Sequence, residues 1–549
     1  MKNYPLYPID YYTDFASFID GIGKKYAEKP AISWFTRKKE EKGVTYGQLR
    51  EQVFALQDML RRKGLAGKHL AILGENCYEW LLAYFAAVSC GGLAVCVDTE
   101  QSDETIHQML AMADSDAVFV SSQYLDICQS FEDKKIPIFL LNGAADGCET
   151  VASLVEQGEK YRKEGKALSP RDGEVSPEKT AVIVFTSGTT SLPKPVMLTH
   201  GGLLTNASDA DATVLVGDRV FTALPFYHTY GMGDAVLAML IKGVHLYING
   251  NLKLFSRDLH LAKPHTMLTV PLILESIHNQ IWLAAEQAGK ADGLRKLLKL
   301  QKLKRGLGFK KTGRLLSEIR EKAVGTLELA ICGGAHMPKD IMEEFELLGV
   351  TVLQGYGITE CSPLVCVNRN HANKLDSVGV VMPHTEIRIE DGEILVRGIN
   401  VMAGYYKHPE LTEEVMSGEW FRTGDVGEID KDGFLSITGR KKNLVVFKNG
   451  KKVSPEKLEE KIKKIPLVKD VVVYGAASGV SADDVKLAAS IYPDPERTGH
   501  MTSYEILEEL QTEIDVINDG LPLYQQIQMV NIREQEFSKT SMQKIKRYV

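Results

Sequence analysis

The sequence has no long hydrophobic run. No stretch of about 18 consecutive apolar residues occurs in the 549 residues, so we expect no transmembrane helix. The N-terminal segment MKNYPLYPID lacks the hydrophobic core that a secretory signal peptide needs. We therefore expect a soluble, cytoplasmic protein.

Metal-binding cysteine spacings and an excess of basic residues are also missing. The eight cysteines form no C-x-x-C pair and no His-rich cluster, and several lie in apolar runs. This pattern favours reduced, buried thiols over disulfides or a zinc site. The formal net charge of −7 argues against a nucleic-acid-binding protein, because no global positive charge is present to release counterions.

The sequence does have an ordinary globular composition, with 44% hydrophobic and 25% charged residues. Its length predicts more than one domain. In the first 113 residues, apolar runs at 31–34, 70–73 and 93–97 alternate with segments of helical periodicity at 78–89 and 104–113. This alternation is typical of a parallel, doubly wound α/β sheet.

Later parts of the chain predict a change of architecture. The polar, lysine-rich segment 150–180 is expected to be an exposed connection. Beyond about residue 376, short alternating strands with glycine turns predict a smaller β-rich lobe. Residues 439–443 are expected to be a hinge between an N-terminal domain, 1–438, and a C-terminal α/β domain, 444–549.

A loop of small and hydroxyl-bearing residues follows the apolar run 181–185. Short side chains let backbone N–H groups approach phosphate oxygens, hydroxyls add donors, and Lys194 adds a positive charge, so this loop can wrap a polyphosphate. It is not a Walker loop, because no glycine precedes Lys194 and Pro195 follows it. An ordinary turn between strands is the alternative. The loop residues are Thr186, Ser187, Gly188, Thr189, Thr190 and Ser191.

The segment TSGTTSLPK resembles the phosphate-binding signature of the adenylate-forming (AMP-binding) superfamily, which includes acyl-CoA synthetases, peptide-synthetase adenylation domains and luciferases. The chain looks most similar to bacterial long-chain fatty acyl-CoA synthetases. The resemblance implies a large N-terminal domain of doubly wound sheets, a small β-rich lobe and a mobile C-terminal α/β domain. Further motifs follow in the superfamily's order: LPFYHTYG at 224–231, QGYGITE at 354–360, FRTGD at 421–425, GRKKN at 439–443 and SKTSMQKIKR at 538–547.

The resemblance also implies catalytic roles. Glu360 and Thr186 would hold Mg²⁺, His228 would line the carboxylate pocket, and Lys544 would bridge carboxylate and α-phosphate during adenylation. Such residues suit the chemistry, because a carboxylate attacking ATP brings anions together and must be positioned and neutralised. For His228, a structural role beside aromatic residues is the alternative.

A second set of residues is implied in binding ATP and the pantetheine arm of coenzyme A. Tyr356, one of these residues, would stack on the adenine, and a structural role in the core is the alternative. The set is Ser187, Gly188, Thr189, Thr190, Lys194, Gly333, Gly334, Ala335, Gly355, Tyr356, Gly357, Thr359, Asp425, Arg440, Lys442 and Gly450.

Four positions depart from the superfamily's usual pattern. Ser191 and Pro195 stand where glycine is usual, Gln543 replaces the glycine before Lys544, and Ser538 replaces a proline. Proline fixes φ and lacks an N–H, whereas glycine bends freely. We therefore expect a phosphate loop that is stiffer, poorer by one donor, and weaker in binding ATP.

The implied function is a two-step acid–thiol ligase. ATP and a carboxylic acid, expected to be a medium- or long-chain fatty acid, give an acyl-adenylate and pyrophosphate, and the acyl group then passes to coenzyme A. A stand-alone adenylation enzyme that loads a fatty or aryl acid onto the phosphopantetheine of an acyl carrier protein is the second hypothesis. A nucleotide-binding regulatory protein without catalysis is the third hypothesis. The presence of four residues argues against it: Lys194, Glu360, Asp425 and Lys544. Asp234 keeps an amino-acid substrate open.

Residues 291–322 carry nine positive charges between Arg295 and Arg314, with leucines near helical spacing. One interpretation is a basic amphipathic surface for anionic lipid at the inner membrane face or for an acidic carrier protein. The other is a solvated helix packed on the main domain. We favour the second, because runs of charge are mostly solvated faces.

Overall fold

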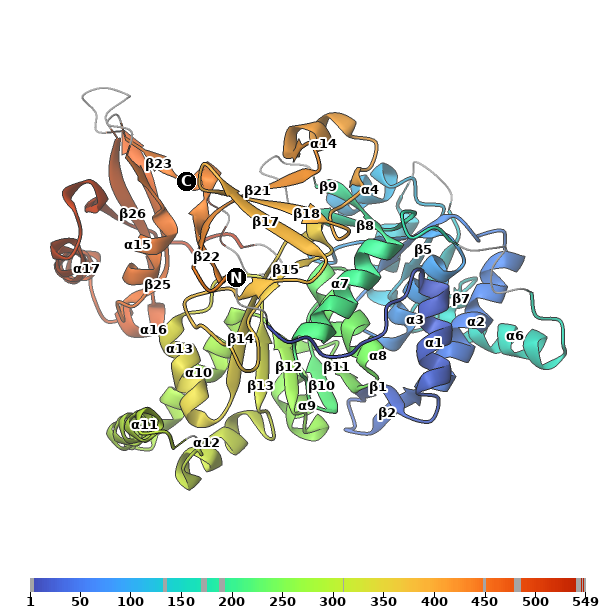
Figure 1. The fold of residues 1–549 in the computed structure, drawn as a ribbon, viewed down its shortest axis with the longest axis horizontal. Helices are drawn as coiled ribbons and strands as arrows, with labels where there is room; N and C mark the ends of the chain where they lie inside the picture. The colour runs from blue at the N-terminus through green and yellow to red at the C-terminus, as the bar shows by residue number, and fades with distance from the viewer. Residues whose placement is uncertain are drawn as a thin grey trace. The chain divides into compact units, whose positions relative to one another are not determined.

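The computed structural model describes residues 4–131, 136–168, 175–186, 193–309, 311–447, 451–477, 485–539, 545 and 547. The chain forms two compact units, coloured by residue number in Figure 1. Unit 1 comprises Met1–Ile387, Val396–Phe421 and Asp432–Phe434, and unit 2 comprises Arg388–Leu395, Arg422–Lys431 and Leu435–Val549. The expected hinge, 439–443, falls within unit 2, and its role as a hinge remains a prediction.

One sheet of unit 1 has eight strands in its described part, in the order β19-β9-β8-β4-β3-β5-β6-β7. Neighbours from β8 to β7 are parallel, which confirms the predicted doubly wound arrangement, whereas β9 is antiparallel to both β8 and β19. The strands are β3 (His69–Leu73), β4 (Leu93–Cys96), β5 (Ala117–Val120), β6 (Ile138–Leu140), β7 (Glu149–Thr150), β8 (Thr180–Thr186), β9 (Lys194–Thr199) and β19 (Gly404–Tyr405).

Both faces of this sheet are covered by helices. Ala71, Val95 and Val118 share an apolar cluster with α4 (Asp103–Met112). The helix α3 (Tyr78–Ser89) contacts β3 and β4 but adds nothing to that cluster, so it covers the opposite face. Strands buried on both faces must be apolar almost throughout, which is why their runs could be found in the sequence.

The other large sheet of unit 1 has, among the described residues, nine strands in the order β16-β15-β14-β13-β12-β10-β11-β1-β2. Pairing is parallel from β14 to β1 and antiparallel at β2, β15 and β16. The strands are β1 (Pro30–Phe35), β2 (Glu41–Thr45), β10 (Arg219–Thr222), β11 (His245–Ile248), β12 (Thr266–Thr269), β13 (Leu329–Cys332), β14 (Thr351–Gly357), β15 (Leu364–Val367) and β16 (Val380–Val381).

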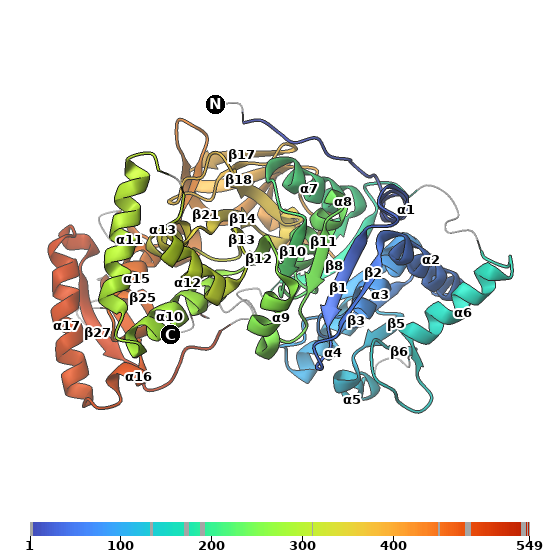
Figure 2. The same cartoon turned by 90° about the horizontal axis from the view of Figure 1, so that it is seen from below.

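The remaining helices of unit 1 pack around these sheets (Figure 2). Among the described residues, no helix of the protein is long and apolar enough to cross a membrane. The helices are α1 (Phe15–Lys25), α2 (Tyr46–Arg62), α5 (Leu125–Gln129), α6 (Val151–Lys163), α7 (His200–Thr213), α8 (Met239–Lys242), α9 (Phe255–Ala262), α10 (Pro271–Gln287), α11 (Ala291–Gly306), α12 (Arg314–Val324), α13 (Lys339–Leu348) and α14 (Pro409–Val415).

Helix α6 corrects the expectation of an exposed connection over 150–180. The side chain of Thr150 caps α6 by accepting the N–H of Ser153, and the helix packs against α2. Gly158 permits this close approach, because a Cβ there would lie 2.1 Å from the carbonyl oxygen of Ala55. The prediction was wrong because it was based on the lysine-rich composition of this segment. The Thr150 cap and the apolar residues on one face of the helix indicate α6 instead.

A five-stranded sheet accounts for the predicted β-rich lobe, with the order β17-β18-β21-β20 and with β22 paired to β21. The boundary between the units passes through its strands. They are β17 (Thr385–Glu390), β18 (Glu393–Gly398), β20 (Met416–Ser417), β21 (Trp420–Ile429) and β22 (Leu435–Arg440).

The rest of unit 2 is the predicted C-terminal α/β structure, with its own apolar core around Leu458, Val471, Ile491 and Leu510. The first helix, α15, begins after Ser454 and has proline at its first position. The elements are β23 (Val445–Val446), β24 (Lys452–Val453), α15 (Pro455–Ile462), β25 (Val468–Ala477), β26 (Val485–Pro493), α16 (Pro495–Thr498), α17 (Ser503–Asp519) and β27 (Ile527–Ile532).

Two of the buried carboxyl groups of unit 1 have raised pKa values, that of Asp211 on α7 and that of Asp234 in the π-helix η2 (Tyr230–Ala238). Within the described part of the chain, both carboxyl oxygens of Asp211 lack a hydrogen-bond partner, and so does Oδ1 of Asp234. Burial raises the pKa of Asp234 to about 8 and raises that of Asp211 well above its ordinary value. Asp234 is therefore mainly a neutral acid at pH 7.

This burial predicts how stability changes with pH. The folded chain holds a proton that the unfolded chain releases near pH 4, so the stabilisation is complete below pH 4 and is lost as pH rises towards 8. Asp234→Asn should remove this loss. Urea-unfolding curves should show that, between pH 5 and 8, the free energy of unfolding of the variant rises relative to that of the wild type by about 1 kcal/mol per pH unit. A difference that stays constant over this range would contradict the assignment.

Candidate active site

The predicted phosphate loop joins two paired strands. Thr186, the last residue of β8, lies directly opposite Lys194, the first residue of β9, so the two ends of the loop are held side by side. The loop residues Ser187, Gly188, Thr189, Thr190 and Ser191 lie outside the described residues.

Pro195 is part of β9 rather than of the loop, which corrects the expectation that it stiffens the loop. It lies opposite Phe185, and its carbonyl oxygen accepts the N–H of Tyr406 at 2.8 Å. Proline lacks an N–H but keeps this acceptor, so the strand bond towards β19 survives. A stiffer loop with weaker binding of ATP therefore does not follow from Pro195.

Lys194, Tyr405 and Glu360 come together beside this hairpin. The hydroxyl of Tyr405 donates to Oε1 of Glu360 at 2.9 Å, and the Lys194 ammonium lies 5.1 Å from the centre of the Tyr405 ring. Strand pairing explains the cluster, because Tyr405 of β19 lies opposite Val196 of β9. The backbone N–H of Met402 also donates to the Glu360 carbonyl at 2.8 Å, which ties the two segments together.

The cluster fits the magnesium ion that the resemblance implies. Mg²⁺ is usually held by one or two carboxylates together with phosphate oxygens and water, and Glu360 supplies one carboxylate. Burial and the nearby charge of Glu360 raise the pKa of Tyr405, so the phenol remains a donor that fixes this carboxylate. Across the described residues, no three His, Cys, Asp or Glu side chains gather into a metal site of their own. The role of Thr186 as a second ligand remains a proposal.

Other predicted site residues follow the carboxyl ends of parallel strands, which meet at one edge of a sheet. Gly333, Gly334 and Ala335 follow β13, and Gly355, Tyr356 and Gly357 end β14. Tyr230, after β10, packs on Gly333, and its hydroxyl donates to the carbonyl of Ile331 at 2.9 Å. Thr229 and Thr359 bring their hydroxyl oxygens to 3.5 Å.

His228 lines a small apolar cavity of about 10 Å³. Its Nδ1 accepts the N–H of Tyr230 at 3.3 Å, so a neutral ring carries its proton on Nε2. Asp234, the residue for which an amino-acid substrate was considered, is buried but does not line this cavity. Apolar and aromatic walls come from several elements: Tyr84, Val182, Leu198, Phe226 and Met232.

Unit 2 holds the predicted ribose-binding residues. Asp425 of β21 lies opposite Arg440 of β22, and the two form an ion pair of 2.7 Å. Gly424 has a φ of +70°, which glycine adopts at little cost, and so lets the chain turn directly before Asp425. The Thr423 hydroxyl accepts the N–H of Asp425 at 3.0 Å and donates to the Ile394 carbonyl at 2.7 Å.

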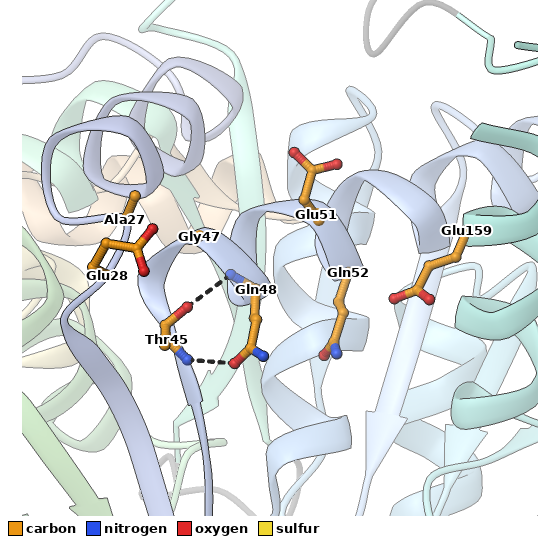
Figure 3. A pocket seen from close by; sticks show the side chains of 8 residues that line it. All are labelled: Ala27, Glu28, Thr45, Gly47, Gln48, Glu51, Gln52 and Glu159. Carbon is orange, nitrogen blue, oxygen red and sulfur yellow. Dashed lines mark hydrogen bonds between the residues drawn. The ribbon is translucent and has the colours of Figure 1, made fainter. Parts of the chain in front are cut away.

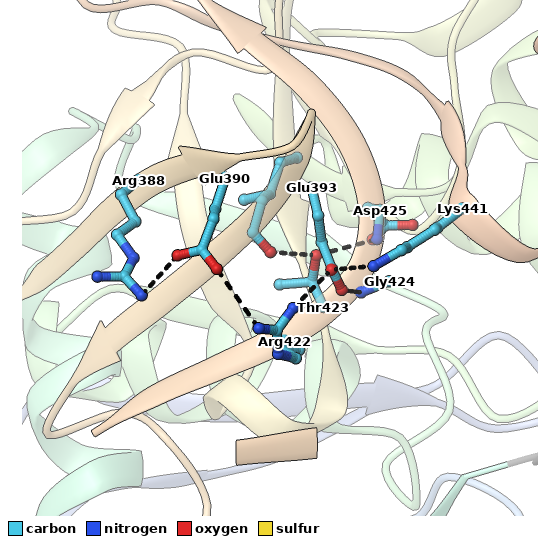
Figure 4. Close-up of polar contacts among 9 residues, drawn as sticks. Arg388, Glu390, Glu393, Arg422, Thr423, Gly424, Asp425 and Lys441 are labelled. Carbon is cyan, nitrogen blue, oxygen red and sulfur yellow. Dashed lines mark hydrogen bonds and ion pairs between the residues drawn. The ribbon is translucent and has the colours of Figure 1, made fainter. Parts of the chain in front are cut away.

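Glu393 anchors this turn, as Figure 4 shows. Its carboxylate accepts the N–H of Gly424 at 3.2 Å, pairs with Lys441 at 2.7 Å and pairs with Arg422 at 3.2 Å. Desolvation alone would raise the pKa of Glu393, but Lys441, Gly424 and Arg422 outweigh it and lower the pKa. The buried carboxylate is thus charged and holds the turn on one side and the residue before Lys442 on the other.

The structure adds two residues that the sequence analysis missed. No motif or spacing in the sequence points to Tyr405, because its contacts with Lys194 and Glu360 depend on the pairing of β9 with β19. Glu393 gave a weak one, since a carboxylate at the start of the apolar run 394–396 is rarely buried without partners. Lys442 lies in the short 3₁₀ helix η5 (Lys441–Asn443). Gly450 and Lys544 lie outside the described residues.

A hollow of about 440 Å³ lies in a different part of unit 1 (Figure 3). Thr45, Gln48 and Gln52 line it together with Glu28, Glu51 and Glu159, and no predicted site residue takes part. Its acidic lining does not suit a nucleotide or a carboxylic acid.

Comparison with known proteins decides the family. A model described as AMP-binding enzyme matches residues 20–406, and one described as AMP-binding enzyme C-terminal domain matches residues 442–548. The chain belongs to the AMP-binding enzyme family. The resemblance predicted from the sequence and the class of enzyme, an acid–thiol ligase, are confirmed.

Several known proteins are similar to this chain along most of their length. Long-chain-fatty-acid–CoA ligase FadD15 of Mycobacterium bovis is 27% identical over 82% of this chain and 78% of its own. Long-chain-fatty-acid–[acyl-carrier-protein] ligase AEE15 of Arabidopsis thaliana is 27% identical over 85% and 75%. The solved structure of the anthranilate CoA ligase AuaEII in complex with anthranoyl-AMP has a TM-score of 0.78 at 18% identity, covering 98% and 96%. This likeness confirms the predicted fold.

The Tyr405–Glu360 contact predicts the effect of a single hydroxyl group. Tyr405→Phe removes a hydrogen bond to a carboxylate, worth about 1.5 kcal/mol, so kcat/KM for ATP should fall roughly tenfold and more Mg²⁺ should be needed for half-maximal rate. Pyrophosphate release at several Mg²⁺ concentrations measures both. Tyr406→Phe is the matched control, because that hydroxyl donates to Asp114 at 2.7 Å instead. Equal effects of the two substitutions would contradict the role of Tyr405.

The Glu393 contacts predict a change in nucleotide binding. Glu393→Gln keeps the shape of the side chain but removes the charge shared by Lys441 and Arg422, so the turn at Asp425 should loosen. We expect KM for ATP to rise about tenfold with kcat changed by less than about threefold. Glu390→Gln, at a carboxylate that pairs with Arg388 and Arg422, should change neither value by more than about twofold. A fall in kcat alone would contradict a positioning role.

Proposed function

We propose that this enzyme activates a medium- or long-chain fatty acid with ATP and transfers the acyl group to coenzyme A. The observation that carries the proposal is the position of the apolar cavity. Its wall includes His228 and Thr229, and the hydroxyl of Thr229 meets that of Thr359, the residue directly before Glu360. The cavity itself has a volume of only about 10 Å³, so the support comes from the apolar character of its lining beside the Lys194–Glu360 cluster, which suits a hydrocarbon chain with a carboxylate head once the walls open.

The first step forms a bond between a carboxylate oxygen and the α-phosphorus of ATP and breaks the bond to pyrophosphate. Lys194 would neutralise phosphate charge, and Asp425 would accept the ribose hydroxyls beside Arg440. Bound Mg²⁺ would supply charge to the phosphate oxygens, held by Glu360 and Thr186. Lys544 would bridge the carboxylate and the α-phosphate. Such fixed charges stabilise the transition state because they need no reorganisation.

The second step transfers the acyl group to sulfur. The thiolate attacks the carbonyl carbon, the bond between that carbon and the AMP oxygen breaks, and AMP leaves. We propose that Lys442 is the hinge about which residues 444–549 turn between the steps, and that Gly450 approaches the pantetheine arm. Gating of this kind lets one chain serve two reactions in turn.

The choice of acid and acceptor rests on further observations. An amino acid is disfavoured, because Asp234 does not line the cavity and its raised pKa leaves it mainly uncharged at pH 7. Coenzyme A is favoured as acceptor by the similarity to FadD15. An acyl carrier protein is the second candidate for the acceptor, because the chain is also similar to AEE15, which is named as an acyl-carrier-protein ligase.

A panel of acids tests the proposal. We expect pyrophosphate release to saturate with fatty acids of medium or long chain at a kcat/KM at least about tenfold above that for benzoate or amino acids, since each buried methylene adds about 0.8 kcal/mol. Coenzyme A and a holo-carrier protein are then offered as alternative acceptors. Release without any preference for chain length would contradict the fatty-acid assignment, and no release with any acid would favour the regulatory hypothesis.

Lys544→Ala is the control that separates the two steps. It should lower pyrophosphate release by about 100-fold, the usual loss for one preorganised charge. Transfer to coenzyme A from acyl-adenylate supplied in the assay should remain nearly intact. Equal loss in both steps would contradict the role proposed for this lysine.

A further inference from the structure

Helix α11 (Ala291–Gly306) has one face packed on unit 1. Leu294 and Leu298 are buried in an apolar cluster with Leu347 and Leu348, at the end of α13. Figures 1 and 2 both show α11 beside α10 and α13. The sequence-based interpretation of 291–322 as a helix packed on the main domain is therefore right for this face.

The opposite face of α11 carries a second apolar stripe. Leu300 and Leu303 of the helix are 49% and 68% exposed, and Leu307 at its C-cap and Phe309 beyond it are 77% and 66% exposed. Spacings of three and four residues place the leucines on one side of the helix. Leu303 follows Leu294 by nine residues, about two and a half turns, so it points away from the core.

The basic residues of α11 divide between these faces. On the packed side, Lys302 pairs with Glu343 at 2.7 Å and Arg305 with Glu346 at 3.6 Å, both on α13. Lys296, Lys299 and Lys304 flank the exposed leucines, and among the described residues none of the three forms an ion pair. The charges that hold the helix in place are thus distinct from those beside the stripe.

We propose that the exposed face of α11, defined by Leu300, Leu303, Leu307, Lys296, Lys299 and Lys304, binds the surface of an anionic lipid membrane. Exposed leucines in a row are costly in water unless a partner covers them. Leucines flanked on both sides by lysine suit an interface, because the apolar side chains enter the acyl boundary while the ammonium groups meet lipid phosphates.

An acidic carrier protein is the competing partner. The membrane is favoured by the shape of the surface, since the leucines project from a single convex helix, whereas helix recognition by proteins commonly uses an apolar groove. The charges agree, because three lysines that form no ion pair within the described part of the chain complement a surface of many phosphates. Binding of a membrane through α11 does not depend on which acid or acceptor the enzyme uses.

The full-length protein should be mixed with vesicles of phosphatidylglycerol and phosphatidylcholine, or of phosphatidylcholine alone, and separated by flotation without substrates. We expect binding to the anionic vesicles, at least about tenfold weaker binding to neutral ones, and loss of binding in high salt. Lys296→Gln, Lys299→Gln and Lys304→Gln combined should weaken binding by about 100-fold, since each lysine near the surface contributes roughly fivefold.

A matched pair of double variants tests the leucines. Leu303→Glu with Leu307→Glu should abolish flotation, whereas Leu215→Glu with Leu252→Glu, at sites 50% and 66% exposed elsewhere on unit 1, should leave it unchanged. Both pairs should keep the unfolding midpoint of the wild type. Wild-type protein that does not float with anionic vesicles would overturn the proposal. So would a Leu303/Leu307 variant that floats normally but no longer acylates a carrier protein, because the face would then belong to that partner.

Discussion

The pairing of β9 with strands on both sides is the constraint on which the candidate active site depends. Its antiparallel contact with β8 holds Thr186 opposite Lys194, and its contact with β19 brings Tyr405 beside Lys194. Tyr405 in turn fixes the carboxylate of Glu360. Strand pairing therefore places Lys194 and, through the Tyr405 side chain, the carboxylate of Glu360, the two groups that we propose bind phosphate and magnesium. This explains why Pro195 is tolerated in β9, since the bond that links this strand to β19 at that point uses its carbonyl group.

Unit 2 uses a buried carboxylate in a comparable way. Glu393 is charged although it is buried, because two cations and a backbone N–H together offset the cost of desolvation. The same contacts fix the glycine turn before Asp425 and hold Lys441 directly before Lys442. A single buried charge thus couples the geometry of the turn that we propose binds ribose to the segment in which we expect the hinge.

The sequence predicted those parts of the structure that follow from local rules. The predicted apolar runs correspond to strands β1, β3, β4 and β8, and the helical periodicity over 78–89 corresponds to α3, because local patterns of apolar residues determine these elements. The antiparallel strands at the sheet edges, and with them Tyr405 and the true position of Pro195, depend on contacts between distant segments that no spacing reveals. Helix α6 and the two faces of α11 were obscured by lysine-rich composition, which hides a narrow apolar stripe.

The central claim is that a carboxylate oxygen attacks the α-phosphorus of ATP, and the transfer of that oxygen tests it most directly. A long-chain fatty acid labelled with ¹⁸O at both carboxylate oxygens should be converted with ATP and coenzyme A, and the products analysed by mass spectrometry. The account predicts one labelled oxygen in AMP, one in the acyl thioester and none in pyrophosphate. Labelled orthophosphate, with ADP in place of AMP, would contradict it.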